Sequence, residues 1–448
     1  MPYVLNTPAD VADMLAAIGV KSIDELFAPI PPEVRLGREL DIPAALSEME
    51  LEQHVAALAK KNQAAGQNVC FLGGGSYDHF IPTVVDAIAG RSEFYTAYTP
   101  YQAEASQGSL QAFFEYQTLI CQLTGMDVAN ASLYEGGSAV AEAVIMAINV
   151  TERKGDVVVP DTVHPEYRQV LATYLANLGV KLVTIPCPGG YLEPATLKKA
   201  VSDQTAAVVL QHPNFFGHLE EASEITRLTH DAGALAVASF DPIAVGILKR
   251  PGDYGADIAV AEGQCLGTPM GYGGPYLGVM ACRSEYMRKI PGRLVGETTD
   301  RNGKRCWVLT LQTREQHIRR DKATSNICTN QGLFALRATV YLTALGPQGL
   351  KETAELCLQK AHYAADVLSQ VPGVKKRFDR PFFKEFALKV PGDVPATLTK
   401  MQSAGYFAGL HAGRWYPALN DTITVAVTEK RTRAEIDGLA AALRNVVS

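Results

Sequence analysis

Short apolar runs alternate with helix-length segments through the middle of the chain, from about residue 110 to residue 290. Strands that are buried on both faces read as continuous apolar runs, and parallel neighbours need a crossover long enough for a helix. The pattern therefore predicts an α/β fold with a mostly parallel central sheet and helices on both faces. The predicted strands span residues 156–159, 181–185, 206–211, 235–239, 257–261 and 276–281, and helices are expected at 165–178 and 220–232.

The first part of the chain has the pattern of short helices separated by proline. Thr7 precedes Pro8, which is typical of a helix start. Capping boxes are expected at Ser22 and Ser47, because each is followed three residues later by a glutamate. A proline-rich stretch between them indicates an irregular crossing segment. We interpret this part as an arm that packs on another surface.

The pattern changes again beyond about residue 330, where a small α+β domain is expected. Helices are predicted at 331–345, 350–370 and 433–446, and strands at 385–390 and 422–428. The predicted organisation is an N-terminal helical arm and interface segment at 1–105, a large α/β domain at 106–328 and a small C-terminal domain at 329–448.

The composition is that of a globular protein long enough to bury a large core. Of its 448 residues, 47% are apolar and 20% are charged. The net charge of −6 gives no general attraction for nucleic acid or for an anionic membrane. The eight cysteines form no CxxC pair and no ligand-like spacing, and the chain shows neither a leader nor a membrane-length apolar run. We therefore expect a cytoplasmic protein with reduced thiols and no metal site.

A glycine pair, Gly136 and Gly137, stands with Ser138 at the start of a helical run. Close backbone approach, free N–H groups and the helix dipole suit such a turn to a phosphate. A tight turn without a ligand is the commoner explanation of the same residues. Both interpretations stay open on this motif alone.

An acid, Asp241, follows the predicted strand at 235–239. Ligands of α/β sheets bind at the carboxyl ends of parallel strands, and an acid there would keep a pyridine nitrogen protonated. The alternative is that Asp241 caps the next turn. The following strand leads into a glycine-rich loop, residues 262–275, that contains no lysine. The nearest lysines outside it are Lys249 and Lys289.

Two more segments carry groups suited to a site wall or a subunit contact. Five potential cations, among them Arg314, His317, Arg319 and Lys322, fall between residues 314 and 322. A charge run is usually a solvated helix face, but arginines also hold carboxylates or a partner chain. Three tyrosines, Tyr95, Tyr98 and Tyr101, surround Pro100, and the simplest explanation is a core or interface loop.

These segments together resemble the P-protein family of the glycine cleavage system. The similarity is carried by residues 98–102 and 125–132 and, most specifically, by the run QTREQHIRRDKATSNICT at 312–329. It extends over nearly the whole chain and is to the N-terminal half of the long, single-chain P-protein. In many bacteria the family's enzyme is split into two chains, and this sequence resembles subunit 1, the α chain.

The resemblance implies a fold-type-I pyridoxal-phosphate architecture and a subunit of glycine dehydrogenase (aminomethyl-transferring, decarboxylating), an oxidoreductase. With a β chain, in an implied α2β2 assembly, it would decarboxylate glycine on pyridoxal phosphate and release CO2. The aminomethyl group would pass to the lipoyl group of the carrier H-protein. The α chain by itself is expected to be inactive.

One departure from the family pattern assigns the roles of the two chains. In the catalytic half of the family a His-Lys pair precedes a Thr-Pro and a glycine run, and that lysine carries the cofactor. Aligning Thr268-Pro269 puts Gln264 at the lysine position. An amide cannot form a Schiff base. Asp241 matches the acid at the pyridine nitrogen and Gly136, Gly137 and Ser138 lie near the phosphate turn, so these positions are expected to be vestigial. Pyridoxal phosphate is then expected on the β chain and not covalently on this one.

The resemblance leaves no certain catalytic residue in this chain. Tyr98 and Tyr101 are candidates for a loop that reaches the partner's cofactor. Arg314, His317, Arg319 and Lys322 are candidates for lining the entrance or holding the subunit contact. Two alternatives stay open, a purely structural or regulatory pseudoenzyme subunit and a self-sufficient pyridoxal enzyme that uses another lysine.

Overall fold

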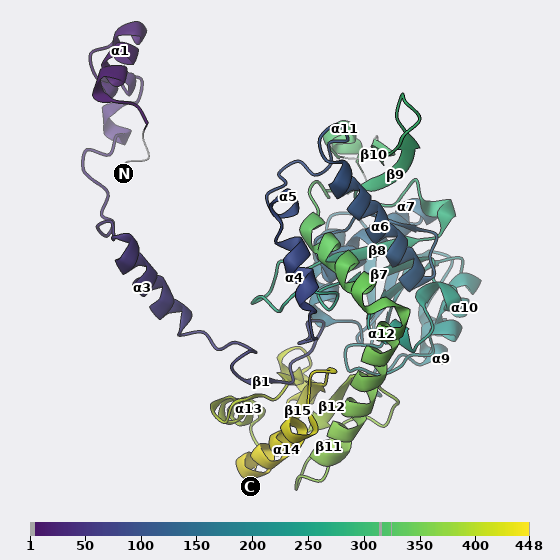
Figure 1. Cartoon of the computed structure of the whole chain (residues 1–448). Helices are drawn as coiled ribbons and strands as arrows, with labels where there is room; N and C mark the ends of the chain where they lie inside the picture. Colours follow the sequence, from purple (N-terminus) through teal and green to yellow (C-terminus); the bar gives the residue numbers. More distant parts are fainter. Residues whose placement is uncertain (1–4, 313–315, 324, 448) are drawn as a thin grey trace. The chain divides into compact units, whose positions relative to one another are not determined.

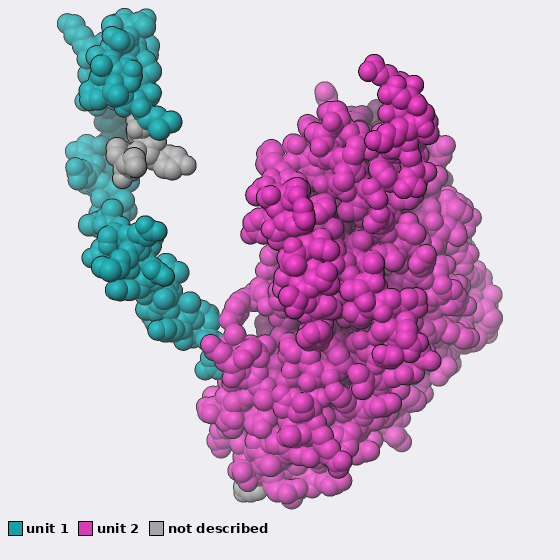
Figure 2. All heavy atoms as spheres, viewed as in Figure 1, with its two compact units in different colours: residues 1–63 teal, residues 64–448 magenta. Residues whose placement is uncertain are grey.

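The computed structural model describes residues 5–312, 316–323 and 325–447, which form two compact units (Figure 2). Unit 1 comprises residues 1–63 and unit 2 comprises residues 64–448. The further division at residues 105 and 328 that the sequence predicts stays a prediction.

The described residues of unit 1, from residue 5 to residue 63, form the helices α1 (Pro8–Ile18), α2 (Ile23–Leu26), η1 (Pro32–Val34) and α3 (Glu48–Ala59). The capping boxes at Thr7 and Ser47 are present, as predicted for Ser47. The box predicted at Ser22 is wrong, because the Ser22 side chain caps nothing. The Glu25 carboxylate instead accepts a hydrogen bond from the backbone N–H of Lys21, at 3.1 Å.

No described residue of unit 1 is buried by the unit's own packing. Ile18, Phe27, Leu40, Met49 and Val55 are each at least 50% exposed. Apolar surface of this extent is typical of a segment that packs on another surface. The interface role of this arm stays a prediction.

Unit 2 is built on a seven-stranded sheet with the order β2-β8-β7-β6-β5-β3-β4 (Figure 1). The five strands β7, β6, β5, β3 and β4 run parallel to one another. β8 pairs antiparallel with β7, and β2 pairs antiparallel with β8. Their bounds are β2 (Val128–Ala129), β3 (Asp156–Pro160), β4 (Lys181–Ile185), β5 (Thr205–His212), β6 (Leu235–Phe240), β7 (Ile258–Glu262) and β8 (Gly278–Cys282). All six predicted strands are found, and the predicted fold class is confirmed; β2 was not predicted.

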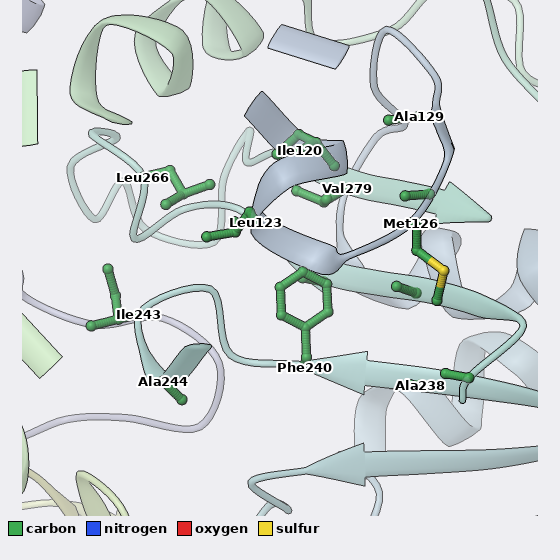
Figure 3. Packing of buried hydrophobic residues seen from close by; sticks show 14 of the residues in the cluster. Ile120, Leu123, Met126, Ala129, Ala238, Phe240, Ile243, Ala244, Leu266 and Val279 are labelled. Carbon is green, nitrogen blue, oxygen red and sulfur yellow. The ribbon is translucent and has the colours of Figure 1, made fainter. Parts of the chain in front are cut away.

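Helices cover both faces of this sheet, because alternate residues of each strand point to opposite sides. Along β3, Val158 packs into one core and Val157 and Val159 into the other. The first core is closed by α6 (Gln107–Thr124), α9 (Pro194–Ala200), α10 (Ala222–Asp231) and α12 (Gly332–Leu368), and the second by α7 (Gly136–Thr151) and α8 (Pro165–Leu175). Figure 3 shows Ile120 and Leu123 of α6 packed near Phe240 of β6.

The C-terminal part of unit 2 forms a second, antiparallel sheet. Its order is β11-β12-β15-β14, with β11 (Lys375–Lys376), β12 (Glu385–Lys389), β14 (Leu410–His411) and β15 (Thr422–Ala426). Helices α13 (Val394–Ser403) and α14 (Arg433–Val447) accompany it. The two long helices predicted before it are joined in α12, which breaks at Gly346 (φ 61°, ψ −179°) just before Pro347.

The remaining elements are short. They are β1 (Val69–Cys70), which pairs in parallel with β13 (Tyr406–Phe407), the hairpin β9 (Leu294–Thr299) and β10 (Arg305–Thr310), the helices α4 (Thr83–Ala89), α5 (Ser92–Tyr95) and α11 (Gln316–Arg319), and the single turns η2 (Ala244–Gly246), η3 (Pro251–Tyr254), η4 (Ser284–Tyr286), η6 (Arg320–Lys322), η7 (Ala412–Arg414) and η8 (Pro417–Leu419). Among the helices of the described residues, none is long and apolar enough to cross a bilayer.

Candidate functional site

A small pocket lies at the carboxyl ends of β5, β6 and β7, where open α/β sheets bind ligands. Asp241 follows β6 directly and Glu262 is the last residue of β7. Tyr77 and residues 383–385, which lead into β12, also line the pocket. The remaining lining residues are Gly75, His164, Tyr167, Gln211, Pro213, Asn214, Gly217, Ser239, Phe240, Pro242 and Cys265.

Asp241 is already paired with a cation from this chain. Its carboxylate lies 2.7 Å from Nζ of Lys384, a side chain that is only 1% exposed. The same ammonium stands 3.8 Å from the ring centroid of Tyr77. Burial alone would lower the pKa of Lys384, but the Asp241 carboxylate raises it above the ordinary value. The acid expected to meet a pyridine nitrogen therefore holds a lysine ammonium.

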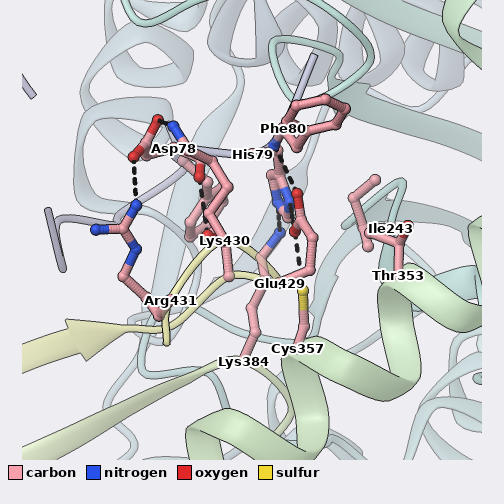
Figure 4. A network of polar contacts seen from close by, with 12 residues as sticks. Asp78, His79, Phe80, Ile243, Thr353, Cys357, Lys384, Glu429, Lys430 and Arg431 are labelled. Atoms are coloured by element: carbon pink, nitrogen blue, oxygen red, sulfur yellow. Dashed lines mark hydrogen bonds and ion pairs between the residues drawn. The ribbon is translucent and has the colours of Figure 1, made fainter. Parts of the chain in front are cut away.

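The Lys384 ammonium continues into a buried network of polar groups (Figure 4). It lies 3.0 Å from Nε2 of His79, and Nδ1 of His79 lies 2.6 Å from the carboxylate of Glu429. Burial and the neighbouring ammonium lower the pKa of His79, so its ring is neutral, accepts from Lys384 and donates to Glu429. Although burial would raise it, hydrogen bonds from the His79 ring and from the backbone N–H of Phe80 lower the pKa of Glu429. Lysine and glutamate charges are thus linked through a neutral imidazole.

The side chain of Cys357 completes a group of metal-ligand types with His79 and Glu429, whose ligand atoms lie within 4.8 Å of one another. Their hydrogen bonds are already made within the protein, since Glu429 also accepts from the backbone N–H of Phe80 at 2.6 Å. The adjacent Lys384 ammonium opposes a second cation. We interpret this group as part of the structural network.

The glycine turn at the start of α7 holds two carboxylates. Glu135 accepts hydrogen bonds from the backbone N–H groups of Gly137 and Ser138, the latter at 2.9 Å, and Glu262 accepts from Gly136 at 3.0 Å. Burial raises the pKa of Glu262 to about 7. The three N–H donors of this turn, for which a phosphate was one of two open interpretations, are therefore satisfied by acids of the chain itself.

Gln264 is fixed by its own amide. Its Oε1 accepts from the backbone N–H of Tyr77 at 2.9 Å, and its Nε2 donates to the carbonyl oxygens of Tyr77 and Thr268 at 3.1 and 2.7 Å. Gln264 is buried, with only 1% of its surface exposed. The backbone N–H of Gln264 donates to Glu262 at 2.9 Å, so Glu262 connects this position with the turn of α7. The Gln264 amide thus ties the loop to residue 77.

The space left in the pocket is about 40 Å³. That is room for a few water molecules, whereas small-molecule sites enclose about 300–1,000 Å³. The turn at the start of α7 is occupied by the carboxylates of Glu135 and Glu262. Asp241 is paired with Lys384, and position 264 holds a hydrogen-bonded amide. The residues present therefore do not fit pyridoxal phosphate.

The candidate wall residues lie elsewhere. Tyr98 and Tyr101 line a second cavity together with residues 329–333, so the structure brings the tyrosine loop to the segment at the start of α12. His317 and Arg319 lie on α11 and Lys322 in η6, all exposed. Arg314 lies outside the described residues.

Sequence reasoning missed Lys384, His79, Glu429 and the role of Glu135. One signal was available, because Lys384 and Glu385 interrupt an aromatic run (Phe382, Phe383, Phe386) that leads into a strand. Charged residues in such a run are buried only when they are paired. The identity of their partners has no signature in the sequence.

Comparison with known proteins gives consistent matches over the full length. The family model of the glycine cleavage system P-protein matches residues 1–443. The chain is 53% identical over 443 residues to a probable glycine dehydrogenase (decarboxylating) subunit 1 of Carboxydothermus hydrogenoformans, covering 99% of both chains. It is 50% identical over 448 residues to the protein so named from Moorella thermoacetica, covering all of both.

Solved structures agree with these relatives. A crystal structure of glycine decarboxylase (P-protein) of the glycine cleavage system, in inhibitor-bound form, superposes with a TM-score of 0.92 and 45% identity, covering all of both chains. More distant structures share the fold alone. One is a sphingosine-1-phosphate lyase of Burkholderia pseudomallei, with a TM-score of 0.67, 14% identity and coverage of 93% of this chain and 94% of that one. Another is a cystine C–S lyase variant with glycine linked to its pyridoxal-phosphate cofactor, with a TM-score of 0.62, 14% identity and coverage of 86% and 100%.

Proposed function

This chain belongs to the glycine cleavage system P-protein family, and on that premise we propose that it is the cofactor-free subunit of a two-chain glycine decarboxylase. The observation that carries the proposal is the filled pocket around Asp241. Carboxylates of Glu135 and Glu262 stand at the anion turn, the Lys384 ammonium meets Asp241, and the Gln264 amide replaces the lysine. A chain built in this way supports a site without holding the cofactor.

The partner in this proposal is the second, lysine-bearing subunit, in an α2β2 assembly. Its pyridoxal phosphate supplies the electron sink for loss of CO2 from glycine. The aminomethyl group then passes to the lipoyl group of the H-protein. The relatives' designation as subunit 1 supports the existence of a second chain.

This chain's own contribution is a wall of the partner's site. Tyr98, which is 96% exposed, and Tyr101 present phenol groups on a loop, and the exposed His317, Arg319 and Lys322 offer positive charge, as does Arg314 in the sequence. Phenol and cationic groups suit the orientation of a carboxylate such as that of glycine. A purely structural subunit is the alternative, and it differs only in whether these side chains touch a substrate.

Cofactor labelling tests the proposal. The two chains are mixed with pyridoxal phosphate, reduced with borohydride and analysed by mass spectrometry. We expect one label for each partner chain, on a single lysine, and none on this chain, because its pocket has no room for the cofactor. The control is this chain unfolded in urea, whose accessible lysines should react non-specifically. A stoichiometric label at one lysine of the folded chain would mean that it is an enzyme in its own right.

Substitution of the loop tyrosines separates a site wall from a purely structural subunit. In the assembled complex, Tyr98→Phe should lower glycine–bicarbonate exchange by about tenfold or more, if its hydroxyl assists a proton transfer or orients the substrate. Because Tyr98 is exposed, its removal should leave assembly unchanged on gel filtration. Tyr101→Phe should also lower the rate, although it additionally removes the hydroxyl that donates to Asn330.

Tyr272→Phe is the matched control, because this tyrosine is 77% exposed and lies in the glycine-rich loop. It should leave exchange at the wild-type rate. Wild-type exchange in both Tyr98→Phe and Tyr101→Phe would favour the purely structural subunit.

A further inference from the structure

The backbone of Ser132 is strained. Its φ of +116° lies in the region that favours glycine, and the residue is buried. Ser132 belongs to the segment between β2 and α7 and lies outside the pocket around Asp241. Residues with a side chain keep such a conformation only where the surrounding structure holds them in it, and they concentrate at functional sites. The strain therefore directs attention to the contacts that the Ser132 side chain makes.

The Ser132 hydroxyl lies at the centre of a buried polar network. It accepts from the side-chain amide of Asn330 at 2.8 Å and from the backbone N–H of Gln331 at 3.1 Å, at the start of α12. The backbone N–H of Ser132 donates to the side chain of Asn130 at 3.2 Å, and Asn130 donates to the carbonyl oxygen of Pro291 at 3.0 Å. Three segments that are far apart in the sequence thus meet around this residue.

Asn330 connects this network with the tyrosine loop. Its Nδ2 also donates to the carbonyl oxygen of Ala131 at 2.6 Å, so both amide protons are used by residues 131 and 132. The Oδ1 atom is thereby the one that faces the Tyr101 hydroxyl, from which it accepts. The guanidinium of Arg293 lies 3.9 Å from the centroid of the Tyr101 ring. Tyr101 is therefore held both at its hydroxyl and at its ring.

The backbone at position 132 does not itself require a serine. Glycine would adopt the same φ without strain. Serine costs backbone strain but supplies the hydroxyl that accepts from Asn330 and Gln331. The network leads to Tyr101, which lines a cavity together with the exposed Tyr98. The strain at Ser132 is thus linked, through one amide, to the orientation of a phenol.

We propose that Asn330 and Ser132 are positioning residues, which set the orientation of the Tyr101 phenol on the wall that this chain contributes to the partner's site. The use of Tyr101 in the reaction rests on the proposed function, whereas its orientation depends on this chain alone. Neither Asn330 nor Ser132 touches a substrate, and each acts through Tyr101. A phenol that is free to turn spends only part of its time in the productive direction, so loss of positioning lowers the rate.

Fluorine NMR on the full chain labelled with 3-fluorotyrosine tests the orientation without any activity. The Tyr101 resonance is assigned as the one that is lost in Tyr101→Phe. It should shift or split in Asn330→Ala and in Ser132→Gly, because the hydroxyl loses its fixed partner. Ser132→Gly guards against a folding defect, since glycine suits the backbone at this position. A Tyr101 resonance at its wild-type position in both variants would overturn the proposal.

Thr329→Ala is the matched control for the spectrum. This exposed residue precedes Asn330 and lines the same cavity as Tyr101. Its side chain takes no part in the hydrogen bonds that join Ser132, Asn330 and Tyr101. The variant should therefore leave the Tyr101 resonance where it is in the wild type.

A double-mutant cycle in the complex with the partner chain tests whether Asn330 acts through Tyr101. Asn330→Ala should lower kcat of glycine–bicarbonate exchange by about tenfold or more, as a misplaced group does. Asn330→Ala/Tyr101→Phe should stay within about twofold of the slower single variant, because no phenol remains to be positioned. Losses that multiply would mean that Asn330 acts independently of Tyr101, which contradicts the proposal. If the resonance moves but Tyr101→Phe exchanges at the wild-type rate, the positioning is supported and the wall role in the proposed function fails.

Discussion

Replacing Lys384 by methionine is expected to destabilise the folded chain by about 3–5 kcal/mol, the usual cost of breaking a buried ion pair by removing one partner. The substitution keeps the side chain's length but removes the ammonium that lies 2.7 Å from Asp241 and 3.0 Å from His79. Asp241 would then be a carboxylate with 13% of its side chain exposed and no cation beside it. Urea unfolding followed by circular dichroism gives the change in the free energy of unfolding.

Two further variants show whether the loss of stability comes from the buried ion pair. Lys430→Met removes a lysine that is 34% exposed and whose partner Asp78 keeps a second ion pair with Arg431, so it should cost less than about 1 kcal/mol. The double variant Lys384→Met/Asp241→Leu removes both charges and should recover most of the loss. A loss for Lys384→Met no larger than that for Lys430→Met would mean that the pocket is hydrated and open.

A second large loss of stability is expected when Gly217 is replaced by alanine. A Cβ atom there would lie 1.8 Å from the carbonyl oxygen of Glu385 and 2.4 Å from its carbonyl carbon, and the backbone has φ +81°. The Gly217 carbonyl also accepts from the backbone N–H of Phe383 at 3.1 Å, so neither segment can withdraw without breaking a hydrogen bond. Gly217→Ala should therefore cost more than about 4 kcal/mol, in the range of the severest single substitutions.

Gly179→Ala is the control that separates crowding from backbone strain. Gly179 has φ +68°, but nothing lies within 4 Å of its would-be Cβ atom. The left-handed conformation alone costs roughly 1–2 kcal/mol for a residue with a side chain. Equal losses at the two positions, measured by the same unfolding experiment, would show that Gly217 is not pressed against Glu385 and that the pocket is less tightly closed than described.

Much of the fold was predictable because it depends on local patterns. Strands such as β6 and β7 are apolar runs buried in the sheet, and their length and spacing are visible in the sequence. The hairpin of β9 and β10 was missed because β9 ends in the exposed residues Glu297, Thr298 and Thr299, which carry no apolar alternation. The capping box at Ser22 was wrong because Glu25 bonds to Lys21 instead, a choice between two neighbouring N–H groups that the motif does not distinguish.

The candidate site was predictable only in part. Asp241, Gln264 and the turn at Gly136 are recognisable because each sits at a strand end or a helix start, and these are local features. Lys384 meets Asp241 only because the second sheet lies against the carboxyl ends of the first. That contact depends on tertiary packing, which no motif in either segment encodes. The role of the wall residues stays a prediction for the same reason, since it depends on another chain.

The hydrogen bonds of Gln264 bear on how this lineage can evolve. A mutation to lysine at position 264 would lose the amide's bonds to Tyr77 and Thr268. It would still leave Glu135 at the start of α7 and Lys384 paired with Asp241. An independent enzyme of the kind the family has would therefore need changes at several contacting positions, whose effects are not additive. On the proposed function, this gene should be retained only in genomes that also keep the gene for the second subunit.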